Sequence, residues 1–526
     1  MHVIVIGAGL SGTLTALKLV EDPATTVTLL EIGSEILPET SSSINECYRL
    51  HMGLHYAKDL YTATNCLHRS IEFARAFPAF VAGHDTPNAP WRRGRHYVMS
   101  NSLVSVQHVR KIAIELSTLY RKLVAEDEAN KVFGDPDSFI RYLTPDEYSH
   151  LATSIPFHHQ DARVESISVA CAIETGESQV DMPGLKADLK LKIAQHDRID
   201  FCPFNEVLAI EQDKDTLEYM VRARGPGAAL INYAGITVVN CAWQNIEKLN
   251  QTLGIETEDQ HRVNRLKASI LVDLPVELRT MNSSIFSLGP YACITVMPNG
   301  TAVLTSERTT NIASFPAGPG ADSSADIHKH VSELTLDTAS GQAVARQILE
   351  DCASYFTPEL AEKLRYANIL ELRLGFVKLM ENDSAYTVSS IYQADSVIHA
   401  RPKEGIESHR LGYISNAGMK MIYTVGNAER VSSTLQLYLR DLGQRNFAMG
   451  RCSPTLFGPN AFEYGLSLMS VFTKVAKKVR YQVSDSSSKL FDQSLNQSIP
   501  LTRSKSLPIL SSLSSPLAKY NGPKSP

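Results

Sequence analysis

Three glycines near the N-terminus have the spacing of a diphosphate-binding turn, in Gly7-Ala8-Gly9-Leu10-Ser11-Gly12. In this motif the first glycine permits a tight turn, the second lets the backbone approach a diphosphate, and the third lets a helix pack closely on a strand. The diphosphate lies at the N-terminus of that helix, where unpaired N–H groups and the helix dipole favour an anion. Ser11 adds a hydroxyl group to the same turn. The chemistry predicted here is the binding of a dinucleotide.

An acidic residue stands at the distance from the turn that a dinucleotide ribose requires. Glu31 follows Gly12 by 19 residues and comes directly after an apolar run from Thr25 to Leu30. A carboxylate at this place accepts hydrogen bonds from a ribose and disfavours a 2′-phosphate, so NADP is not expected. NAD and FAD both stay open, and so does a glycine-rich turn without a ligand.

Beyond the glycine motif, three segments resemble those of a known family. Asn45–Tyr56 is similar to the family pattern Asn…His-x-Gly-x-x-Tyr, Val180–Leu185 to V-D-P-x-x-L, and Val238–Trp243 to V-V-N-A-x-G-x-W. Together with Val3–Gly12 and Glu31, they resemble the FAD-dependent oxidoreductases of the D-amino acid oxidase type. That family includes glycine oxidase, sarcosine oxidase and L-2-hydroxyglutarate dehydrogenase. The resemblance covers about residues 1–440.

The resemblance implies a bound FAD and a set of residues that contact it. The strand Val207–Glu211 would meet the adenine through its backbone, and Gly426 would end a strand at the flavin loop. Ser42 and Ser43 follow the ribose acid closely. The cofactor-binding residues implied are Gly7, Gly9, Ser11, Gly12, Glu31, Ser42, Ser43, Val207, Asn240 and Gly426.

The chemistry implied is the oxidation of a small amino or hydroxy acid by hydride transfer from its Cα to the flavin. His51 and His55 are the candidate bases, because a neutral imidazole takes up a proton near neutral pH. The alternative is that both only hydrogen-bond the backbone or stack on the ring system. Arg373 is the candidate for a bidentate grip on the substrate carboxylate, with Arg308 and Arg49 as further candidates. An arginine on a strand is also often a surface residue.

These residues are expected on alternating strands and helices. Apolar runs at 1–6 and 25–30 flank a helix with apolar residues at 10, 14, 17 and 20, which is typical of the beginning of a doubly wound parallel sheet. The stretch 260–400 is predicted to consist of strands and turns, with a hairpin at Pro298-Asn299-Gly300. Further helices are predicted at 61–76, 105–125, 341–356, 431–442 and from Asp181 onward, and further strands at 96–99, 199–201, 207–211, 236–239 and 422–425.

The predicted fold class is α/β, with a Rossmann-like FAD-binding domain built on a doubly wound parallel sheet and a second, mostly antiparallel α+β substrate domain. The FAD-binding domain is predicted to be discontinuous, and its segments are 1–85, 160–250 and 390–450, with 86–159 and 251–389 forming the substrate domain. Helical spacing of apolar residues predicts an amphipathic helix at 461–480. The serine-rich segment 481–526 is predicted to be a disordered tail.

Composition narrows the class of protein. The 51 Lys and Arg residues against 56 Asp and Glu give a net charge of -5, so no global basic field attracts nucleic acid. The 8 Cys residues form no CxxC pair and have no metal-like spacing, which predicts reduced thiols and a cytoplasmic protein. No apolar run reaches the ~18 residues of a membrane span. A small carboxylate-bearing substrate is the expected partner, and a basic surface at 461–480 would suit peripheral contact with an anionic membrane.

Three functions stay open from the sequence. The first is an FAD-dependent oxidoreductase, and the second is a flavin-binding or dinucleotide-fold scaffold or sensor without turnover. Two departures from the family pattern motivate the second, at Ala242-Trp243 and at Gly426–Arg430. The third is an NAD-dependent enzyme on the same glycine motif. None of the three fixes the substrate, the electron acceptor or the oligomeric state.

Overall fold

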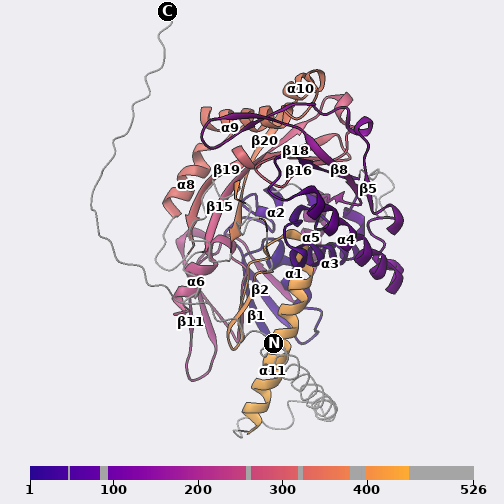
Figure 1. The fold of residues 1–526 in the computed structure, drawn as a ribbon. Coiled ribbons are helices and arrows are strands. Elements are labelled where there is room, and N and C mark those ends of the chain that lie inside the picture. Colours follow the sequence, from indigo (N-terminus) through magenta and orange to yellow (C-terminus); the bar gives the residue numbers. More distant parts are fainter. Residues whose placement is uncertain are drawn as a thin grey trace, which may run out of the picture. The chain divides into compact units, whose positions relative to one another are not determined.

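The structure is a computed structural model that describes residues 1–45, 48–82, 93–255, 262–317, 324–379, 392–393, 399, 401 and 403–448. The chain divides into two compact units, Met1–Asp441 and Leu442–Pro526, and of the second only 442–448 are described. The first unit is organised around two large sheets, which Figure 1 shows with the helices beside them.

The first large sheet is mostly parallel and has six strands in the order β10-β2-β1-β14-β22-β21. Only β21 runs antiparallel to its neighbour. Val3, Ile4 and Val5 in the central strand β1 are fully buried, as expected for a strand covered on both faces. Parallel strands end at the same edge, so the loops after β1, β2, β14 and β22 gather there. The strands are β1 His2–Ile6, β2 Thr26–Leu30, β10 Ile199–Cys202, β14 Thr237–Asn240, β21 Ile406–Arg410 and β22 Tyr413–Asn416.

Helices with capped N-termini accompany this sheet. The Asp59 carboxylate accepts a hydrogen bond from the Thr62 amide at 2.9 Å, and the Asp181 carboxylate accepts one from the Gly184 amide at 3.0 Å. Such caps satisfy N–H groups that a helix leaves unpaired. The helices are α1 Leu10–Leu19, α3 Leu60–Ala76, α4 Val106–Glu126, α5 Met182–Ala194, α6 Ile246–Thr252 and α11 Thr424–Ala448.

The second large sheet has nine strands, in the order β19-β15-β18-β17-β16-β4-β8-β5, with β20 also paired to β15. It is antiparallel except where β16 pairs with β4. The helix α9 packs on β15, β17 and β18. The strands are β4 Gly94–Met99, β5 Ile140–Tyr142, β8 Val169–Thr175, β15 Val263–Asp273, β16 Ser284–Ser287, β17 Ala292–Val296, β18 Thr301–Ser306, β19 Asn311–Pro316 and β20 Asn368–Leu379; the helices nearby are α7 Glu307–Thr310, α8 Ser324–Glu333, α9 Ala339–Ala353 and α10 Pro358–Arg365.

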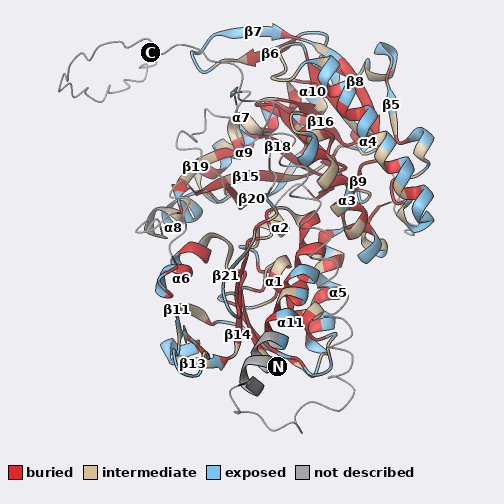
Figure 2. Cartoon of the chain, turned by 60° about the horizontal axis from the view of Figure 1, so that its bottom comes forward, coloured by how far each residue is buried: buried red, intermediate tan, exposed pale blue. Residues whose placement is uncertain are grey.

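Smaller elements complete the described part of the first unit. A three-stranded antiparallel sheet holds β11 to β13, and two-stranded sheets pair β3 with β9 and β6 with β7. Figure 2 shows the buried residues concentrated along the strands of the large sheets, with exposed residues on the outer faces of α4 and α5. The bounds are α2 Ser42–Asn45, β3 Arg49–Leu50, β6 Ile155–His158, β7 Val164–Ile167, β9 Ser178–Gln179, β11 Glu206–Gln212, β12 Tyr219–Arg224 and β13 Leu230–Gly235.

Most of the predicted elements are confirmed, including the opening strand–helix–strand unit, the hairpin at Asn299 and the helices α3, α4, α5 and α9. The predicted strand at 422–425 is wrong. The strand of the parallel sheet is Tyr413–Asn416, whereas Met421–Tyr423 forms a 3-10 turn that leads into α11. A short apolar run fits a buried helix as well as a strand, so periodicity alone did not separate them. The helices α8 and α10 were not predicted.

Most strands of the two large sheets lie in the chain segments that the predicted domains assign to each sheet. Those of the parallel sheet come from 1–85, 160–250 and 390–450, but β8, also within 160–250, pairs in the nine-stranded sheet. The division into two domains stays a prediction, and 461–480 and 481–526 lie outside the described residues. Within the described part of the chain, no helix is both long and apolar enough to cross a membrane.

Candidate active site

The turn between β1 and α1 has the geometry that its three glycines predict. Gly7 has a φ of 91°, and a Cβ placed there would lie 2.7 Å from the Cys241 carbonyl oxygen. A Cβ on Gly12 would overlap the Gly7 carbonyl group. At Gly9, by contrast, the nearest atom to an added Cβ is the Ser41 Oγ, at 3.7 Å. Gly7 and Gly12 are therefore required by packing, whereas Gly9 borders open space at the N-terminus of α1, which no side chain caps.

Glu31 lies at the end of β2 and is only 5% exposed. Its carboxylate accepts hydrogen bonds from the Ala8 amide at 2.6 Å and the Gly33 amide at 2.8 Å, and so ties β2 to the glycine turn. Burial raises the pKa of Glu31, although these amides act against that shift. Two apolar side chains next to it are exposed, Ile32 at 59% and Phe204 at 54%. The sequence analysis missed Phe204, whose backbone reaches Gly33 from a distant part of the chain.

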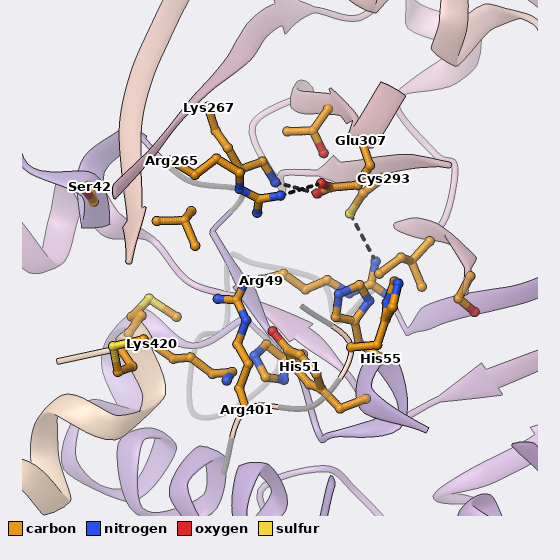
Figure 3. Close-up of a pocket in the computed structure, with 18 of the residues that line it drawn as sticks. Ser42, Arg49, His51, His55, Arg265, Lys267, Cys293, Glu307, Arg401 and Lys420 are labelled. Carbon is orange, nitrogen blue, oxygen red and sulfur yellow. Dashed lines mark hydrogen bonds and ion pairs between the residues drawn. The ribbon is translucent and has the colours of Figure 1, made fainter. Parts of the chain in front are cut away.

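A cavity of about 250 Å³ lies between the segment after α2, the strands β15, β17 and β18, and the loop after β22 (Figure 3). Ser42, Ser43 and Gly418 line it. The same segments reach the glycine turn, because Ser41 lies beside Gly9 and a Cβ on Gly418 would overlap the Ser11 side chain. Ser41 and Gly418 therefore place the glycine turn next to the cavity wall.

The two predicted bases lie together in the cavity wall. His51 and His55 both line the cavity, and the Nδ1 atom of each is buried without a hydrogen-bond partner among the described residues. Burial lowers the pKa of His51 to about 3, with the positive charges of Lys420 and Arg49 acting in the same direction. Burial also lowers the pKa of His55 well below its usual value. Both imidazoles are therefore neutral at physiological pH.

A buried ion network holds the segment that carries His51. The Glu177 carboxylate accepts hydrogen bonds from Arg49 Nε at 2.7 Å, His96 Nε2 at 2.9 Å and the Met52 amide at 3.2 Å. Burial alone would raise the pKa of Glu177, but Arg49 and His96 hold it well below the usual range. Arg49 and Met52 flank His51 in the chain, so Glu177 fixes its backbone from both sides. This role of Glu177 could not be predicted from the sequence, because Glu177 lies more than 120 residues further along the chain.

A second ion cluster lies on the opposite wall of the cavity. Arg265 and Lys267 are two residues apart on β15, so both side chains point to the same face of the sheet. Both contact the Glu307 carboxylate, Arg265 Nη1 at 3.4 Å and Lys267 Nζ at 2.5 Å. Burial acts to raise the pKa of Glu307, but the two cations lower it overall. Figure 3 shows Arg265 extending toward the middle of the cavity.

Arg373, which the sequence analysis predicts to bind the substrate carboxylate, lies outside the cavity wall. Arg373 does not line the cavity: its Nε donates to Glu371 at 2.6 Å, and its guanidinium lies 5.1 Å from the centre of the Tyr48 ring. The β15–β20 register explains this, because Arg373 pairs with Ser269, four residues (about 13 Å) along the strand from Arg265. Arg308 pairs with Asp351 instead. Of the three candidate arginines only Arg49 lines the cavity, and Arg265 was missed.

The loop that the sequence predicts at Gly426 does not follow a strand there. Gly426 lies inside α11, where a Cβ would meet the Arg69 side chain, and it does not line the cavity. The loop that does so follows β22 and includes Gly418 and Lys420. The Lys420 Nζ lies 4.4 Å from the Tyr56 ring centre and 4.9 Å from that of Tyr423.

Asn240, a further predicted contact, has its side-chain amide group hydrogen-bonded within the protein, whereas Val207 lies on the edge of a small sheet. The Asn240 side chain donates hydrogen bonds to the Ile246 carbonyl, Asn250 Oδ1 and the Tyr413 hydroxyl, and so joins β14 to α6 and β22. Val207 lies in β11, an edge strand of the three-stranded sheet that pairs with β12. Neither residue lines the cavity.

Comparison with known proteins identifies the fold. No protein-family model matches the sequence, and no curated protein does so. Among solved structures, glycine oxidase from Geobacillus kaustophilus matches at 15% identity over 82% of this chain and 94% of that one, with a TM-score of 0.52. L-alpha-glycerophosphate oxidase from Mycoplasma pneumoniae, solved with FAD bound, matches at 15% identity over 83% and 94%, with a TM-score of 0.50. A modified fructosyl peptide oxidase from Aspergillus nidulans matches at 11% identity over 83% and 90%, with a TM-score of 0.52. The chain has the fold of these oxidases.

The shared fold confirms the predicted α/β class. The structure also shows what replaces one glycine of the family pattern. Trp243 stands where the pattern V-V-N-A-x-G-x-W has its glycine, and it has a φ of 49°. This left-handed conformation favours glycine over any bulky side chain. Trp243 lines the cavity, and its Nε1 donates a hydrogen bond to the Phe376 carbonyl at 3.0 Å. The backbone of Trp243 thus has the conformation typical of glycine, and its indole ring forms part of the cavity wall.

Proposed function

We propose that this chain is an FAD-dependent oxidoreductase that oxidises a small amino or hydroxy acid. The observation that carries the proposal is that the glycine turn lies next to the cavity wall, through Ser41–Ser43 and Gly418. FAD has a diphosphate at its centre and a flat ring system at one end, which suits such a path. The fold, which the chain shares with an oxidase solved with FAD bound, supports the same reading.

The residues along this path fit FAD. Gly7, Gly9, Ser11 and Gly12 would hold the diphosphate at the N-terminus of α1, where Gly9 leaves room for it. Glu31 would bind the ribose, because its carboxylate lies beside the glycine turn and can accept further hydrogen bonds besides those from the Ala8 and Gly33 amides.

The remaining contacts would lie at the two ends of the cofactor. Ile32 and Phe204 offer exposed apolar surface for the adenine, next to the backbone of Val207. Ser42 and Ser43, with Gly418, would border the flavin. When bound, FAD supplies the hydride acceptor.

The side chains of the cavity supply the other parts of the reaction. Arg265 and Lys267 would bind the substrate carboxylate, and the neutral imidazole of His51 would accept the proton of the hydroxyl or amino group as the hydride leaves Cα. His55, which lines the same cavity, would be the alternative base. The low pKa of His51 describes the cavity without substrate, and a bound carboxylate raises it by adding a negative charge nearby.

Anaerobic reduction of the bound flavin tests this proposal. A panel of amino and hydroxy acids is added to the purified protein without oxygen, and the flavin absorbance is followed. At least one compound is expected to bleach the flavin, and His51→Ala is expected to slow the bleaching at least tenfold while the FAD content stays unchanged. A flavin that stays oxidised with every compound would favour the scaffold or sensor function instead.

A further inference from the structure

Trp243 belongs to a segment that reaches from the glycine turn to the cavity wall. Two residues earlier, Cys241 donates its amide hydrogen to the Ile6 carbonyl at 2.8 Å, and the Cys241 carbonyl oxygen would lie 2.7 Å from a Cβ on Gly7. The Cys241 side chain would lie 3.4 Å from a Cβ on Gly12. The Trp243 side chain lines the cavity. This short segment therefore contacts the glycine turn with one residue and the cavity with another.

Three segments lie both beside the glycine turn and in the cavity wall. The first is Ser41–Ser43, the second contains Gly418, and the third is Cys241–Trp243. A cofactor that extends from the turn into the cavity would pass all three segments. The indole ring of Trp243 is much larger than the side chains of Ser42 and Ser43, so it would offer this cofactor the larger contact surface.

The order of the strands places Trp243 opposite Glu31 across the glycine turn. The strand β1, which leads into the turn, lies between β2 and β14 in the parallel sheet. Glu31 follows β2 directly, whereas Trp243 follows the end of β14. In FAD the diphosphate joins the adenosine to the flavin. With the adenosine ribose at Glu31 and the diphosphate at the turn, the flavin would extend toward the side of β14 and Trp243.

Hydrogen bonds hold the indole ring in place. Its Nε1 atom donates to the Phe376 carbonyl at 3.0 Å, and the Phe376 amide donates to the Ser42 Oγ at 3.0 Å. Trp243 also packs against the apolar cluster of Leu266, Phe315 and Phe376. A side chain that is fixed before its ligand arrives loses little conformational entropy when the ligand binds.

The ring also keeps surface that a ligand can cover. Trp243 is only partly buried, and its side chain faces the cavity. Its φ of 49° lies in the left-handed region, which is unfavourable for a bulky residue. Backbone strain of this kind is concentrated at sites that bind ligands. The strain at Trp243 thus accompanies an aromatic surface at the point where the turn meets the cavity.

We propose that Trp243 binds the flavin half of FAD through its indole ring. This inference rests on the proposed function and assigns a further cofactor-binding residue to it. The isoalloxazine ring of a flavin is flat and aromatic, and such rings pack favourably against an indole. The adenosine half of the cofactor, at Glu31, would have no contact with this ring.

Matched ligands test which half of the cofactor the ring binds. FAD and ADP share the adenosine and the diphosphate, and only FAD has the flavin. Their dissociation constants are measured by calorimetry on protein depleted of FAD. Trp243→Gly removes the ring and suits the left-handed backbone. It is expected to weaken the binding of FAD about 10- to 100-fold, as the loss of one stacked ring does, and to leave the binding of ADP unchanged.

Two further variants serve as comparisons. Phenylalanine keeps an aromatic ring at the same place, so Trp243→Phe should weaken the binding of FAD less than Trp243→Gly does. Tyr366→Gly removes an aromatic ring that is 80% exposed and lies outside the cavity. It should change neither dissociation constant.

A measurement on the intact ring decides the question if Trp243→Gly does not fold. The chain has 2 Trp residues, so protein labelled with fluorotryptophan gives one fluorine signal from each, and Trp91→Phe identifies the signal of Trp243. This signal is expected to shift when FAD is added and to stay unchanged with ADP. A signal that moves equally with both ligands, or with neither, would overturn the inference.

The affinities can contradict the inference in two ways. Equal losses of FAD and ADP affinity in Trp243→Gly would mean that the ring supports the glycine turn and does not bind the flavin. Unchanged or tighter binding of FAD would mean that the ring is neutral or obstructs the cofactor. In both cases the parent protein still binds FAD, and only the inference fails. A parent protein that binds no FAD would contradict the proposed function as well.

Discussion

The two ends of the proposed site are built by different means. The turn at Gly7–Gly12 uses six consecutive residues and acts through backbone groups and the absence of side chains. The cavity uses long charged side chains, among which Arg49 pairs with Glu177, and Arg265 and Lys267 pair with Glu307. The first end therefore allows no added volume at Gly7 or Gly12. The second depends on buried charges, and the loss of one partner leaves the other uncompensated.

The largest effect is expected from Glu177→Gln, which leaves Arg49 without its buried counter-charge. Breaking a buried ion pair from one side costs about 3–5 kcal/mol in the free energy of unfolding. The matched control is Glu211→Gln, which breaks the exposed pair with Arg222 and should cost less than about 1 kcal/mol. Urea unfolding of both variants measures the difference. Equal losses would show that the network around Glu177 does not hold the cavity wall.

At the other end of the site, Gly9→Val should remove the cofactor without unfolding the protein. The added side chain fills the space where the diphosphate belongs, and only Ser41 lies near its Cβ. The FAD content after purification is expected to fall at least tenfold, while the circular dichroism spectrum stays that of a folded protein. Gly9→Ala, with its smaller side chain, should lose less. A Gly9→Val protein with as much FAD as the parent would place the cofactor elsewhere.

The stability of the cavity should depend on pH through His51. Its pKa is about 3 in the folded protein and near 6.5 when unfolded, so below pH 6.5 the unfolded state binds the extra proton. The free energy of unfolding should therefore fall as the pH drops from 6.5, by up to about 1.4 kcal/mol per pH unit from this group. His51→Gln should remove that part of the slope between pH 6.5 and 5, whereas His108→Gln on the surface should not. If the slope is unchanged in His51→Gln, the folded protein does not lower the pKa of His51.

The smallest effect is expected at the junction of the two ends, from Trp243→Phe. Phenylalanine keeps an aromatic ring in the cavity wall but cannot donate to the Phe376 carbonyl. The loss of one hydrogen bond corresponds to about 0.5–1.5 kcal/mol in the free energy of unfolding. A melting curve of the variant measures it, and no change would show that this bond does not stabilise the wall.

The turn could be predicted from the sequence because its determinants are local. The spacing of Gly7 and Gly12, the apolar runs around them and Glu31 all lie within 31 residues, and the structure reproduces their arrangement. His51 and His55 were also found, since a family pattern surrounds them.

The charged wall could not be predicted in the same way. Arg265 and Arg373 are both arginines on strands, and only the β15–β20 register shows that the first faces the cavity. Glu177 and Glu307 lack a local pattern of their own, because their partners come from distant segments. The last strand of the parallel sheet was predicted a few residues too late, because the run Ile422–Val425 resembles the strand Tyr413–Asn416 in its apolar character.

We propose that one FAD molecule extends from the glycine turn to the cavity. The absorbance spectrum of the purified protein tests this directly, with the ratio of FAD to protein determined after release of the cofactor. We expect a flavin spectrum with close to one FAD per chain, and a melting temperature that rises when FAD is added to protein depleted of it. A colourless protein whose melting temperature does not respond to FAD would mean that the chain binds no FAD.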